Sequence, residues 1–426
     1  MKIMRKIFKK LKNNDKLNTS YPVNKEDWLE FKMDEKLQFN NKDICFYIHI
    51  PFCLSKCKFC EYVKYEKTDN ASEQRYIEIL KQDIQNFIDK HKDKNLTGLD
   101  IGGGTPTCLN EDNFKNLLEF VKENIFDKMK LSKDTEPSIE STFLSITEEK
   151  IRIISSNGFK RISFGLQTVN KKFLKENDRS HPTVERMKNA LSWCEKYGIN
   201  KVNIDLMYGL KNQTKKDLKD ALATIEYFKP QQVTLYEFRT NILKIKENMS
   251  KKALFKQYCY LFHKLTRLGY NGIFGQNTFS LDKYDLGLSS YIRHRMLDNT
   301  SYKGFGISAQ SKGSNGVSYN IGKTEQSLEQ ILAHGTFDEE DIYVLPKEEM
   351  AAKYVAISGY SGRFSLKILD EILKETAREY YKNQLEFLLK KRYVTISANN
   401  IVQITKRGIV HYGAILSLFY PSYNKQ

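Results

Sequence analysis

The chain has 426 residues, of which 40% are hydrophobic and 28% charged, and its formal net charge is +17. This length allows two or three domains with sizeable cores, and the composition is that of an ordinary soluble protein. No apolar run approaches the ~18 residues that span a bilayer, and the basic N-terminus lacks the features of a secretory signal, so we expect a cytoplasmic protein without a transmembrane segment. Seven cysteines are too few for a disulfide scaffold in a chain of this length.

The strong positive charge is a feature shared with nucleic-acid-binding proteins. Here, however, lysines are spread along the whole chain among many asparagines, as on a solvated surface. We therefore do not expect a nucleic-acid partner. The same basic surface would attract a substrate that carries several carboxylates.

Residues 1–45 are expected to form a basic N-terminal extension. Ile3, Ile7 and Leu11 recur every four residues among lysines and arginine, which predicts a basic amphipathic helix. Such a helix can lie on a membrane surface, but docking on the chain's own domain is the favoured interpretation.

From residue 46 the pattern becomes regular, with apolar strands that alternate with amphipathic helices. This alternation requires a parallel sheet, so residues 46–270 are predicted to form an α/β domain, a partial (β/α)6 TIM-like barrel. In such barrels the chemistry lies at the carboxyl ends of the strands. The six predicted strands cover residues 46–50, 99–101, 137–141, 160–165, 201–207 and 232–238.

The alternation fades after residue 270. Residues 271–344 are expected to form a connecting segment that closes the barrel, with a Gly/Ser-rich link at 304–322. From residue 345 the pattern is helical, and strands at 393–396 and 401–404 flank Asn399–Asn400 as a predicted hairpin before a last helix near 406–418. Residues 345–426 are therefore predicted to form a helical, winged-helix-like C-terminal domain.

Cys53, Cys57 and Cys60 are spaced C-x3-C-x2-C on the loop after the first predicted strand. Three thiolates on one loop can bind three irons of a cubane cluster and leave the fourth iron open. An open iron can chelate the amino and carboxylate groups of S-adenosylmethionine (SAM) and pass an electron to its sulfonium. The alternative is a zinc site with His49 as the fourth ligand, although zinc sites favour paired C-x2-C units or closed four-ligand sets. The other four cysteines are scattered and are expected to be buried thiols.

The stretch Tyr47-Ile-His-Ile-Pro-Phe-Cys53, continued to Cys60, resembles the radical SAM loop of the oxygen-independent coproporphyrinogen III oxidase (HemN-type) family. The resemblance extends over roughly residues 45–420. It implies a radical SAM core barrel, a [4Fe–4S] cluster on the three cysteines, SAM as the second cofactor and a HemN-type C-terminal domain. The family includes coproporphyrinogen dehydrogenases, haem chaperones and class C radical SAM methyltransferases.

A glycine-rich stretch, Gly102-Gly103-Gly104-Thr105-Pro106-Thr107, follows the second predicted strand. Consecutive glycines let the backbone approach a ligand closely, although a tight strand–helix turn is an equally good structural explanation. The resemblance implies that Gly103, Gly104 and Thr105 hold the methionine end of SAM.

Polar residues also follow the later predicted strands. Each alone could be a structural ion pair or a satisfied core polar group. As an ordered set on consecutive strands, they resemble the SAM-binding residues of the family, with Phe59 packed against the adenine and Arg239 reaching a substrate carboxylate or SAM. The set that the resemblance implies for SAM or the cluster is Tyr47, Phe59, Glu140, Gln167, Arg179 and Asp205; no catalytic residue is assigned.

Two positions depart from the family's best-known branches. Tyr62 stands where typical coproporphyrinogen dehydrogenases carry an additional cysteine. Residues 289–306 lack the His-Asn…Tyr-Trp pattern of the haem chaperones, because His294 is followed by Arg295. Residues 304–309 resemble the family's Gly-x-Gly-x-x-Ala segment, which is expected to close the barrel mouth.

The resemblance therefore implies an oxidoreductase that generates a 5′-deoxyadenosyl radical and acts on a tetrapyrrole, like coproporphyrinogen dehydrogenase. A flavodoxin- or ferredoxin-like protein is the expected electron donor. The alternatives are a class C-type methyltransferase, a haem-binding chaperone and an RNA-modifying enzyme.

Overall fold

A computed structural model describes residues 2–13, 21–22, 25–60, 62–67, 69–238 and 249–421 of the chain. Within these residues, one mixed sheet of twelve strands runs in the order β10-β9-β8-β7-β6-β4-β1-β11-β12-β13-β14, with β5 (Lys130–Leu131) paired to β4. Its central part consists of the six predicted strands, all parallel: β1 (Asp43–Ile50), β4 (Asn95–Gly103), β6 (Ser138–Ser141), β7 (Arg161–Gln167), β8 (Lys201–Tyr208) and β9 (Gln232–Glu237).

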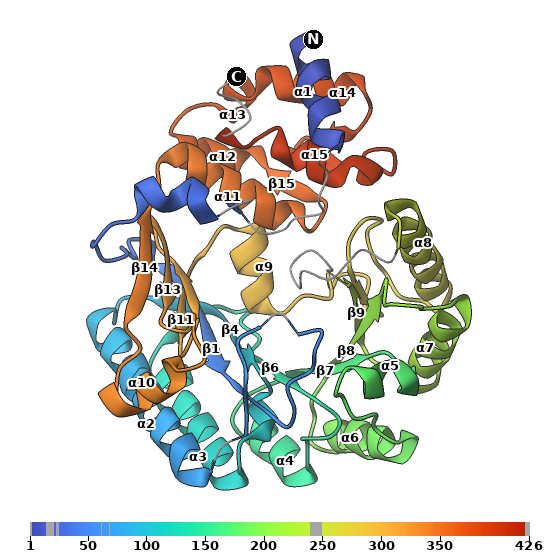
Figure 1. Ribbon diagram of the computed structural model, residues 1–426. Helices are drawn as coiled ribbons and strands as arrows, with labels where there is room; N and C mark the ends of the chain where they lie inside the picture. The colour runs from blue at the N-terminus through green and yellow to red at the C-terminus, as the bar shows by residue number, and fades with distance from the viewer. Residues whose placement is uncertain are drawn as a thin grey trace.

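The sheet curves into a partial barrel, with helices along its outer side (Figure 1). Among the described residues, its end strands β10 (Thr278–Ser280) and β14 (Glu339–Val344) do not pair with each other, so the barrel stays open. The prediction of an α/β fold with a partial (β/α)6 barrel is therefore confirmed. The outer helices are α2 (Asn70–Lys90), α3 (Glu111–Val121), α4 (Glu148–Ser156), α5 (Lys171–Glu176), α6 (Val184–Lys196), α7 (Lys215–Phe228) and α8 (Lys251–Arg267).

Side-chain caps set where these helices begin. The Thr147 hydroxyl accepts a hydrogen bond from the Lys150 backbone N–H at 3.2 Å and starts α4. Thr214 and Asp217 form a reciprocal capping box at the start of α7. Each cap satisfies a backbone donor that the first helical turn leaves without a partner. The helices α3, α4, α5 and α7 begin a few residues after the preceding strand ends, whereas the longer cysteine loop separates β1 from α2.

Residues 301–344 extend the sheet instead of linking two regions, so the prediction of a link at 304–322 is wrong. The segment contains β11 (Ser301–Phe305), β12 (Gln310–Lys312), β13 (Gly316–Asn320) and α10 (Ser327–His334) before β14. Its glycines permit close strand contact, because a Cβ at Gly316 would lie 1.9 Å from the Tyr343 carbonyl oxygen. Glycine and serine here serve strand packing, a role that composition does not distinguish from a linker.

The C-terminal part has its own hydrophobic core. The predicted hairpin is present as β16 (Val394–Ile396) and β17 (Ile401–Ile404), and β15 (Arg363–Ser365) adds a third antiparallel strand, as in a winged helix. The helices of this C-terminal part are α11 (Lys347–Gly359), α12 (Leu366–Leu373), α13 (Ala377–Tyr380), α14 (Lys382–Lys390) and α15 (Tyr412–Ser417), and α9 (Ser290–Leu297) lies beside it.

None of the described helices is long and apolar enough to cross a membrane.

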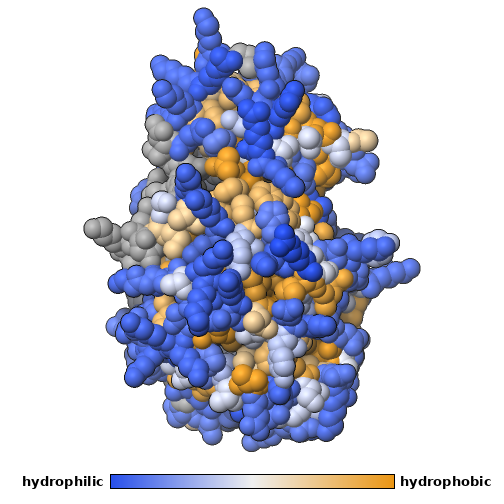
Figure 2. All heavy atoms as spheres, turned by 90° about the vertical axis from the view of Figure 1, so that its right-hand side faces the viewer, coloured by the Kyte–Doolittle hydropathy of each residue, from blue (hydrophilic) through white to orange (hydrophobic). Residues whose placement is uncertain are grey.

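The N-terminal helix α1 (Lys2–Asn13) packs on α14 and α15, although it lies far from them in sequence (Figure 1). Met4, Phe8 and Leu11 are buried in the C-terminal core, whereas Ile3 is 71% exposed. The basic side chains of α1 are exposed, and hydrophilic side chains cover the upper end of the face in Figure 2. The favoured prediction of a basic amphipathic helix docked on its own domain is confirmed.

Candidate active site

A cavity of about 320 Å³ lies at the carboxyl ends of the parallel strands. Its walls come from the cysteine loop, the glycine-rich turn and the ends of β6 to β9. Eleven of the twelve residues predicted for the cluster or SAM line this cavity: Cys53, Cys57, Phe59, Cys60, Gly103, Gly104, Thr105, Glu140, Gln167, Arg179 and Asp205.

Tyr47 is the one predicted residue that does not line the cavity. It lies on β1 and stacks on Tyr291, with ring centroids 5.7 Å apart. Burial and the neighbouring Glu140 charge raise the pKa of Tyr47 well above its usual value. Tyr47 is half-buried, and its contact with SAM or the cluster stays a prediction.

Backbone hydrogen bonds hold the cysteine loop in a defined shape. β2 (Phe52–Cys53) pairs with β3 (Tyr65–Glu66), and the Lys67 N–H donates to the Cys53 carbonyl at 2.8 Å. The Lys64 ammonium donates to the Cys60 carbonyl at 3.0 Å. The loop is therefore closed on itself at both ends of the C-x3-C-x2-C segment.

All three thiols of the loop are free. The Thr105 hydroxyl lies 3.6 Å from Cys53 Sγ, and Arg179 Nη1 lies 3.7 Å from Cys57 Sγ. Burial raises the pKa of Cys53 to about 12, and a bound metal would favour its thiolate form. The three cysteines line one cavity and form no disulfide, which suits a cluster ligand set.

The alternative of a mononuclear zinc site finds no support. Among the described residues, no three His, Cys, Asp or Glu side chains converge so as to hold one metal ion. His49 does not line the cavity; it is buried, and its Nε2 lies 3.3 Å from the Val63 carbonyl oxygen. A cubane cluster instead distributes its three thiolates over three separate irons.

The glycine-rich turn is packed against the cysteine loop. Gly104 N–H donates to the Ile50 carbonyl at 2.7 Å and Thr105 N–H to the Phe52 carbonyl at 2.8 Å. Gly103 has a φ of 112°, and a Cβ there would lie 2.7 Å from the His49 ring. The glycines are thus required by the packing of the protein itself, and the turn also presents its backbone to the cavity.

Three carboxylates lie at or next to the cavity: Glu140 and Asp205 line it, and Asp100 lies near Glu140. Glu140 accepts a hydrogen bond from the Gly103 N–H at 3.3 Å, and its exposed surface faces the cavity. Burial, with the nearby charges of Asp205 and Asp100, raises the pKa of Glu140 to about 7. Burial also raises the pKa of Asp205, against the effect of hydrogen bonds from Asn203 at 2.7 Å and Ser163 at 3.2 Å. Glu140 can therefore be protonated or ionised near neutral pH, depending on the ligand beside it.

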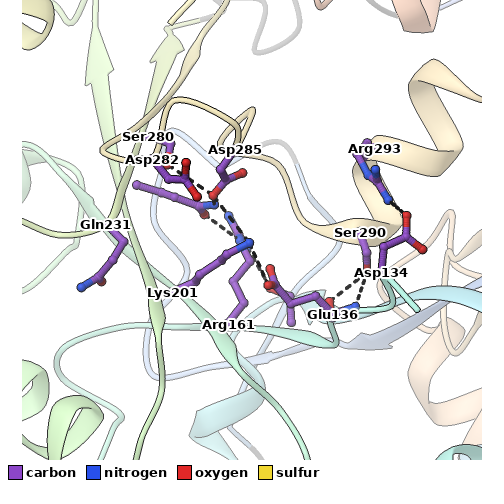
Figure 3. A network of polar contacts seen from close by, with 12 residues as sticks. Asp134, Glu136, Arg161, Lys201, Gln231, Ser280, Asp282, Asp285, Ser290 and Arg293 are labelled. Carbon is purple, nitrogen blue, oxygen red and sulfur yellow. Dashed lines mark hydrogen bonds and ion pairs between the residues drawn. The ribbon is translucent and has the colours of Figure 1, made fainter. Parts of the chain in front are cut away.

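A polar network lies at the amino ends of the strands (Figure 3), and the charge of its Arg161 lowers the pKa values of Asp100, Glu140 and Asp205 against the larger effect of burial. Arg161, the first residue of β7, donates to Gln232 Oε1 and to Ser138 Oγ, each at 2.8 Å. Lys201, the first residue of β8, lies 2.8 Å from Glu136 and 3.6 Å from Asp285. Sequence analysis did not identify this network, although basic or amide residues at the starts of neighbouring strands were a usable signal.

The remaining predicted residues that line the cavity are Gln167, Arg179 and Phe59. Gln167 ends β7 with a φ of 68°, a left-handed conformation that is uncommon for a residue other than glycine. Arg179 donates to the Gly165 carbonyl beside it. Phe59 stacks on Phe173 at 6.0 Å. Arg239 lies outside the described residues.

Tyr236, Glu237 and Phe238, which precede Arg239 at the end of the sixth predicted strand, are expected from the sequence to point into this cavity, and they line it. Met207 and Cys108 also line the cavity, but they were not predicted there. An apolar residue in a strand and a single cysteine do not by themselves indicate a ligand.

Comparison with known proteins gives consistent matches. Residues 47–225 match the family model of the Radical SAM superfamily. The chain is 26% identical to the heme chaperone HemW of Haemophilus influenzae, over 88% of this chain and 97% of that protein. It is also 26% identical to the oxygen-independent coproporphyrinogen III oxidase of Helicobacter pylori, over 87% of this chain and 85% of that protein.

A higher identity, 35%, is found with the heme chaperone HemW of Buchnera aphidicola from Acyrthosiphon pisum, but this match covers 44% of the chain and about half, 48%, of that relative. Among solved structures, coproporphyrinogen III oxidase (HemN) from Escherichia coli has a TM-score of 0.77 over 95% of this chain and 97% of that one, at 23% identity. That likeness establishes the fold.

Proposed function

Because residues 47–225 match the Radical SAM superfamily model and the chain has the fold of HemN, we propose that it is a radical SAM protein that holds a [4Fe–4S] cluster on Cys53, Cys57 and Cys60 and cleaves SAM reductively. The observation that carries this proposal is that three free thiols and the glycine-rich turn line one cavity at the strand ends. When bound, the cluster would supply one electron to SAM at its open iron, giving methionine and a 5′-deoxyadenosyl radical.

The chain's own residues would bind and orient SAM. The backbone of Gly103 and Gly104 would face its methionine end, and the Glu140 carboxylate would accept hydrogen bonds from its ammonium or ribose. Gln167, Arg179 and Asp205 would contact the rest of the molecule, and the Phe59 ring would cover the adenine. Bound SAM would displace water from the cavity, and each polar contact would then be stronger because less water competes for it.

For the substrate we propose a tetrapyrrole, with oxidation of a porphyrinogen side chain as the first candidate reaction. Aromatic and apolar side chains of Phe238, Tyr236, Met207 and Leu54 line the cavity beside the proposed SAM site, which suits a flat, largely apolar ring system. Holding a substrate C–H next to the radical carbon would lower the barrier through proximity and orientation. A flavodoxin- or ferredoxin-like protein remains the proposed electron donor.

A haem-carrying role is the second candidate. It is favoured by the name of the relative from Haemophilus influenzae, a heme chaperone aligned over nearly its full length. His294 offers little as a haem ligand, because its Nδ1 lies 2.8 Å from Asp298 and its Nε2 lies 3.3 Å from Asp134. A chaperone would therefore have to bind haem through other residues.

One anaerobic experiment separates these candidates. The protein is reconstituted with iron and sulfide and incubated with SAM, dithionite and coproporphyrinogen III, and the products are analysed by mass spectrometry. Formation of 5′-deoxyadenosine with loss of one CO2 and two hydrogens per propionate is the result expected for the oxidoreductase. Gain of one CH2 would favour the methyltransferase. Stoichiometric haem binding without substrate conversion would favour the carrier, and a protein that assembles no cluster would refute the proposal as a whole.

A further inference from the structure

Two of the three loop thiols have a side-chain hydrogen-bond donor beside them. The Thr105 hydroxyl lies 3.6 Å from Cys53 Sγ, and Arg179 Nη1 lies 3.7 Å from Cys57 Sγ, both within the range for hydrogen bonds to sulfur. In the described part of the chain, no side chain makes a comparable hydrogen bond to Cys60 Sγ. The two donors come from different elements, the turn after β4 and the segment after α5.

Thr105 is fixed at this place by its backbone. Its N–H donates to the Phe52 carbonyl at 2.8 Å, and its own carbonyl accepts from the Cys108 N–H at 2.8 Å. The side chain is buried, and its hydroxyl also contacts the Cys108 thiol. A hydroxyl has one proton and two lone pairs, so it can accept from the Cys108 thiol and donate to the Cys53 sulfur at the same time.

Arg179 is also positioned before any ligand binds. Its backbone N–H donates to the Leu174 carbonyl at 3.0 Å, and Asp178 before it has a φ of 55°. The Lys58 N–H donates to the Asn177 carbonyl at 3.2 Å, and the Lys58 ammonium lies 3.0 Å from the Asp178 carboxylate. These contacts tie the segment that carries Arg179 to the cysteine loop.

We infer that Thr105 and Arg179 donate hydrogen bonds to the Cys53 and Cys57 thiolates and thereby raise the reduction potential of the cluster. This inference rests on the proposed function, since it requires the cluster. For Thr105 it differs from the role implied by the resemblance, which was contact with the methionine end of SAM. In this effect both residues act through a ligand of the cluster and are positioning residues; the contact of Arg179 with SAM proposed above is a separate role.

The physical reason is the charge that reduction adds. One added electron increases the negative charge on the iron and on the cysteine sulfurs, and a donor aimed at a sulfur stabilises the reduced state more than the oxidised state. The effect is strong where water does not compete, as at the buried Cys57. An arginine adds a full positive charge to its hydrogen bond, so its effect should exceed that of a hydroxyl.

The test is a potentiometric titration of the reconstituted protein, followed by the EPR signal of the reduced cluster, without SAM so that nucleotide contacts do not contribute. Thr105→Val keeps the side-chain shape but removes the donor, and Thr105→Ser keeps the hydroxyl. At the parent's midpoint potential, Thr105→Val should lower the ratio of reduced to oxidised cluster about tenfold, which is about 59 mV for a one-electron couple. Thr105→Ser should match the parent, Arg179→Met should lower the ratio further, and Arg179→Lys should fall between Arg179→Met and the parent.

A second measurement uses the unaltered protein. Exchange into D2O should shift the Fe–S(Cys) stretching frequencies in the resonance Raman spectrum if exchangeable protons bond to the cysteine sulfurs. The inference is overturned if Thr105→Val holds a full cluster at the parent's potential, or if the parent shows no deuterium shift. If Thr105→Val does not assemble a cluster, the deuterium shift of the parent alone tests the inference. Failure of the parent to hold a cluster would instead refute the proposed function.

Discussion

The Glu140 carboxylate fills the space that a side chain at Gly102 would need. A Cβ at Gly102 would lie 2.7 Å from both Cδ and Oε2 of Glu140. The same carboxylate accepts the Gly103 N–H at 3.3 Å, so the glycine-rich turn and the end of β6 form one unit. The absence of a side chain at Gly102 therefore sets where Glu140 points.

Gly102→Ala should displace Glu140 and weaken SAM binding while the cluster still assembles. We expect the dissociation constant of SAM to rise about tenfold, which corresponds to about 1.4 kcal/mol. Anaerobic isothermal titration calorimetry measures the affinity, and iron and sulfide analysis measures the cluster. Gly102→Ala should add little to the defect of Glu140→Gln, since both changes act on one group; fully additive losses would contradict this coupling.

Replacement of single cysteines should distinguish those that bind the cluster from those that bind no iron. Cys57→Ala should lose most of the bound iron, because two thiolates do not retain a cubane with an open iron. Cys108→Ala is the matched control: Cys108 is also a buried thiol that lines the cavity, but it lies outside the C-x3-C-x2-C loop. Iron content and the absorbance of the reconstituted variants report the result. Equal iron loss in both variants would show that Cys108 is a ligand as well.

The raised pKa of Glu140 makes stability depend on pH. Its pKa is about 7 in the folded protein against a usual value of about 4.5, so between these values the unfolded chain binds fewer protons than the folded one. Stability should therefore fall as the pH rises from 4.5 to 7, in proportion to this difference in bound protons. Glu140→Gln has no carboxyl group to ionise, so it lacks this pH-dependent loss of stability. The melting temperature of the variant, relative to that of the parent, should therefore increase from pH 5 to pH 8.

Glu148→Gln serves as the control for that series. The ammonium of Lys196, 2.6 Å away, holds the pKa of the exposed Glu148 below its usual range. Loss of this carboxylate should give no gain in stability as the pH rises. A gain of similar size in both variants would point to net charge and not to the buried carboxylate.

Arg161→Met should destabilise the barrel from its amino end. The substitution removes the hydrogen bonds to Ser138 and Gln232 and the positive charge that favours ionised Asp100 and Asp205. We expect a loss of about 2–3 kcal/mol, the usual size for buried hydrogen bonds to a charged group. The loss should be larger at pH 8 than at pH 5, because the carboxylates are then ionised. Denaturant unfolding at the two pH values tests this.

The packing of α1 can be tested with a pair of substitutions in one helix. Phe8 is 4% exposed and contacts Phe387 and Tyr393 with ring centroids 5.2 Å and 5.5 Å apart. Phe8→Ala should cost about 3 kcal/mol, as for other buried phenylalanines. Ile3→Ala, at a position that is 71% exposed, should change stability by less than about 0.5 kcal/mol. Equal effects would mean that α1 is not docked in solution.

The barrel was predictable because its signals are local. Each parallel strand is an apolar run followed by a helix with a period of 3.6 residues, and the prediction located all six. The cysteine spacing and the glycine-rich turn are also contiguous in sequence. These short-range patterns were enough to identify most of the cavity wall.

The missed features depend on partners distant in sequence. The strands at 301–344 contain small and polar residues, and Gly316 is needed only because the Tyr343 carbonyl oxygen approaches it. Arg161 on β7 donates to Gln232 on β9, two strands away in the sheet, and this pairing depends on the tertiary arrangement of the strands. Tyr47 stacks on Tyr291, a residue far away in the sequence, and this pairing could not be read from the strand that carries Tyr47. Contacts with residues distant in sequence thus decide where a residue lies, even when its residue type suggests a role at the site.

The pairing of β1 has a consequence for how the protein matures. β1 lies between β4, which follows it closely in sequence, and β11, in which Ser301 to Phe305 pair with Ile44 to Ile48. During translation, the strand that leads into the cysteine loop thus lacks one neighbour until most of the polypeptide has left the ribosome. The loop proposed to bind the cluster would consequently gain its last supporting strand late, and cluster insertion would fall to a chain that extends beyond residue 305.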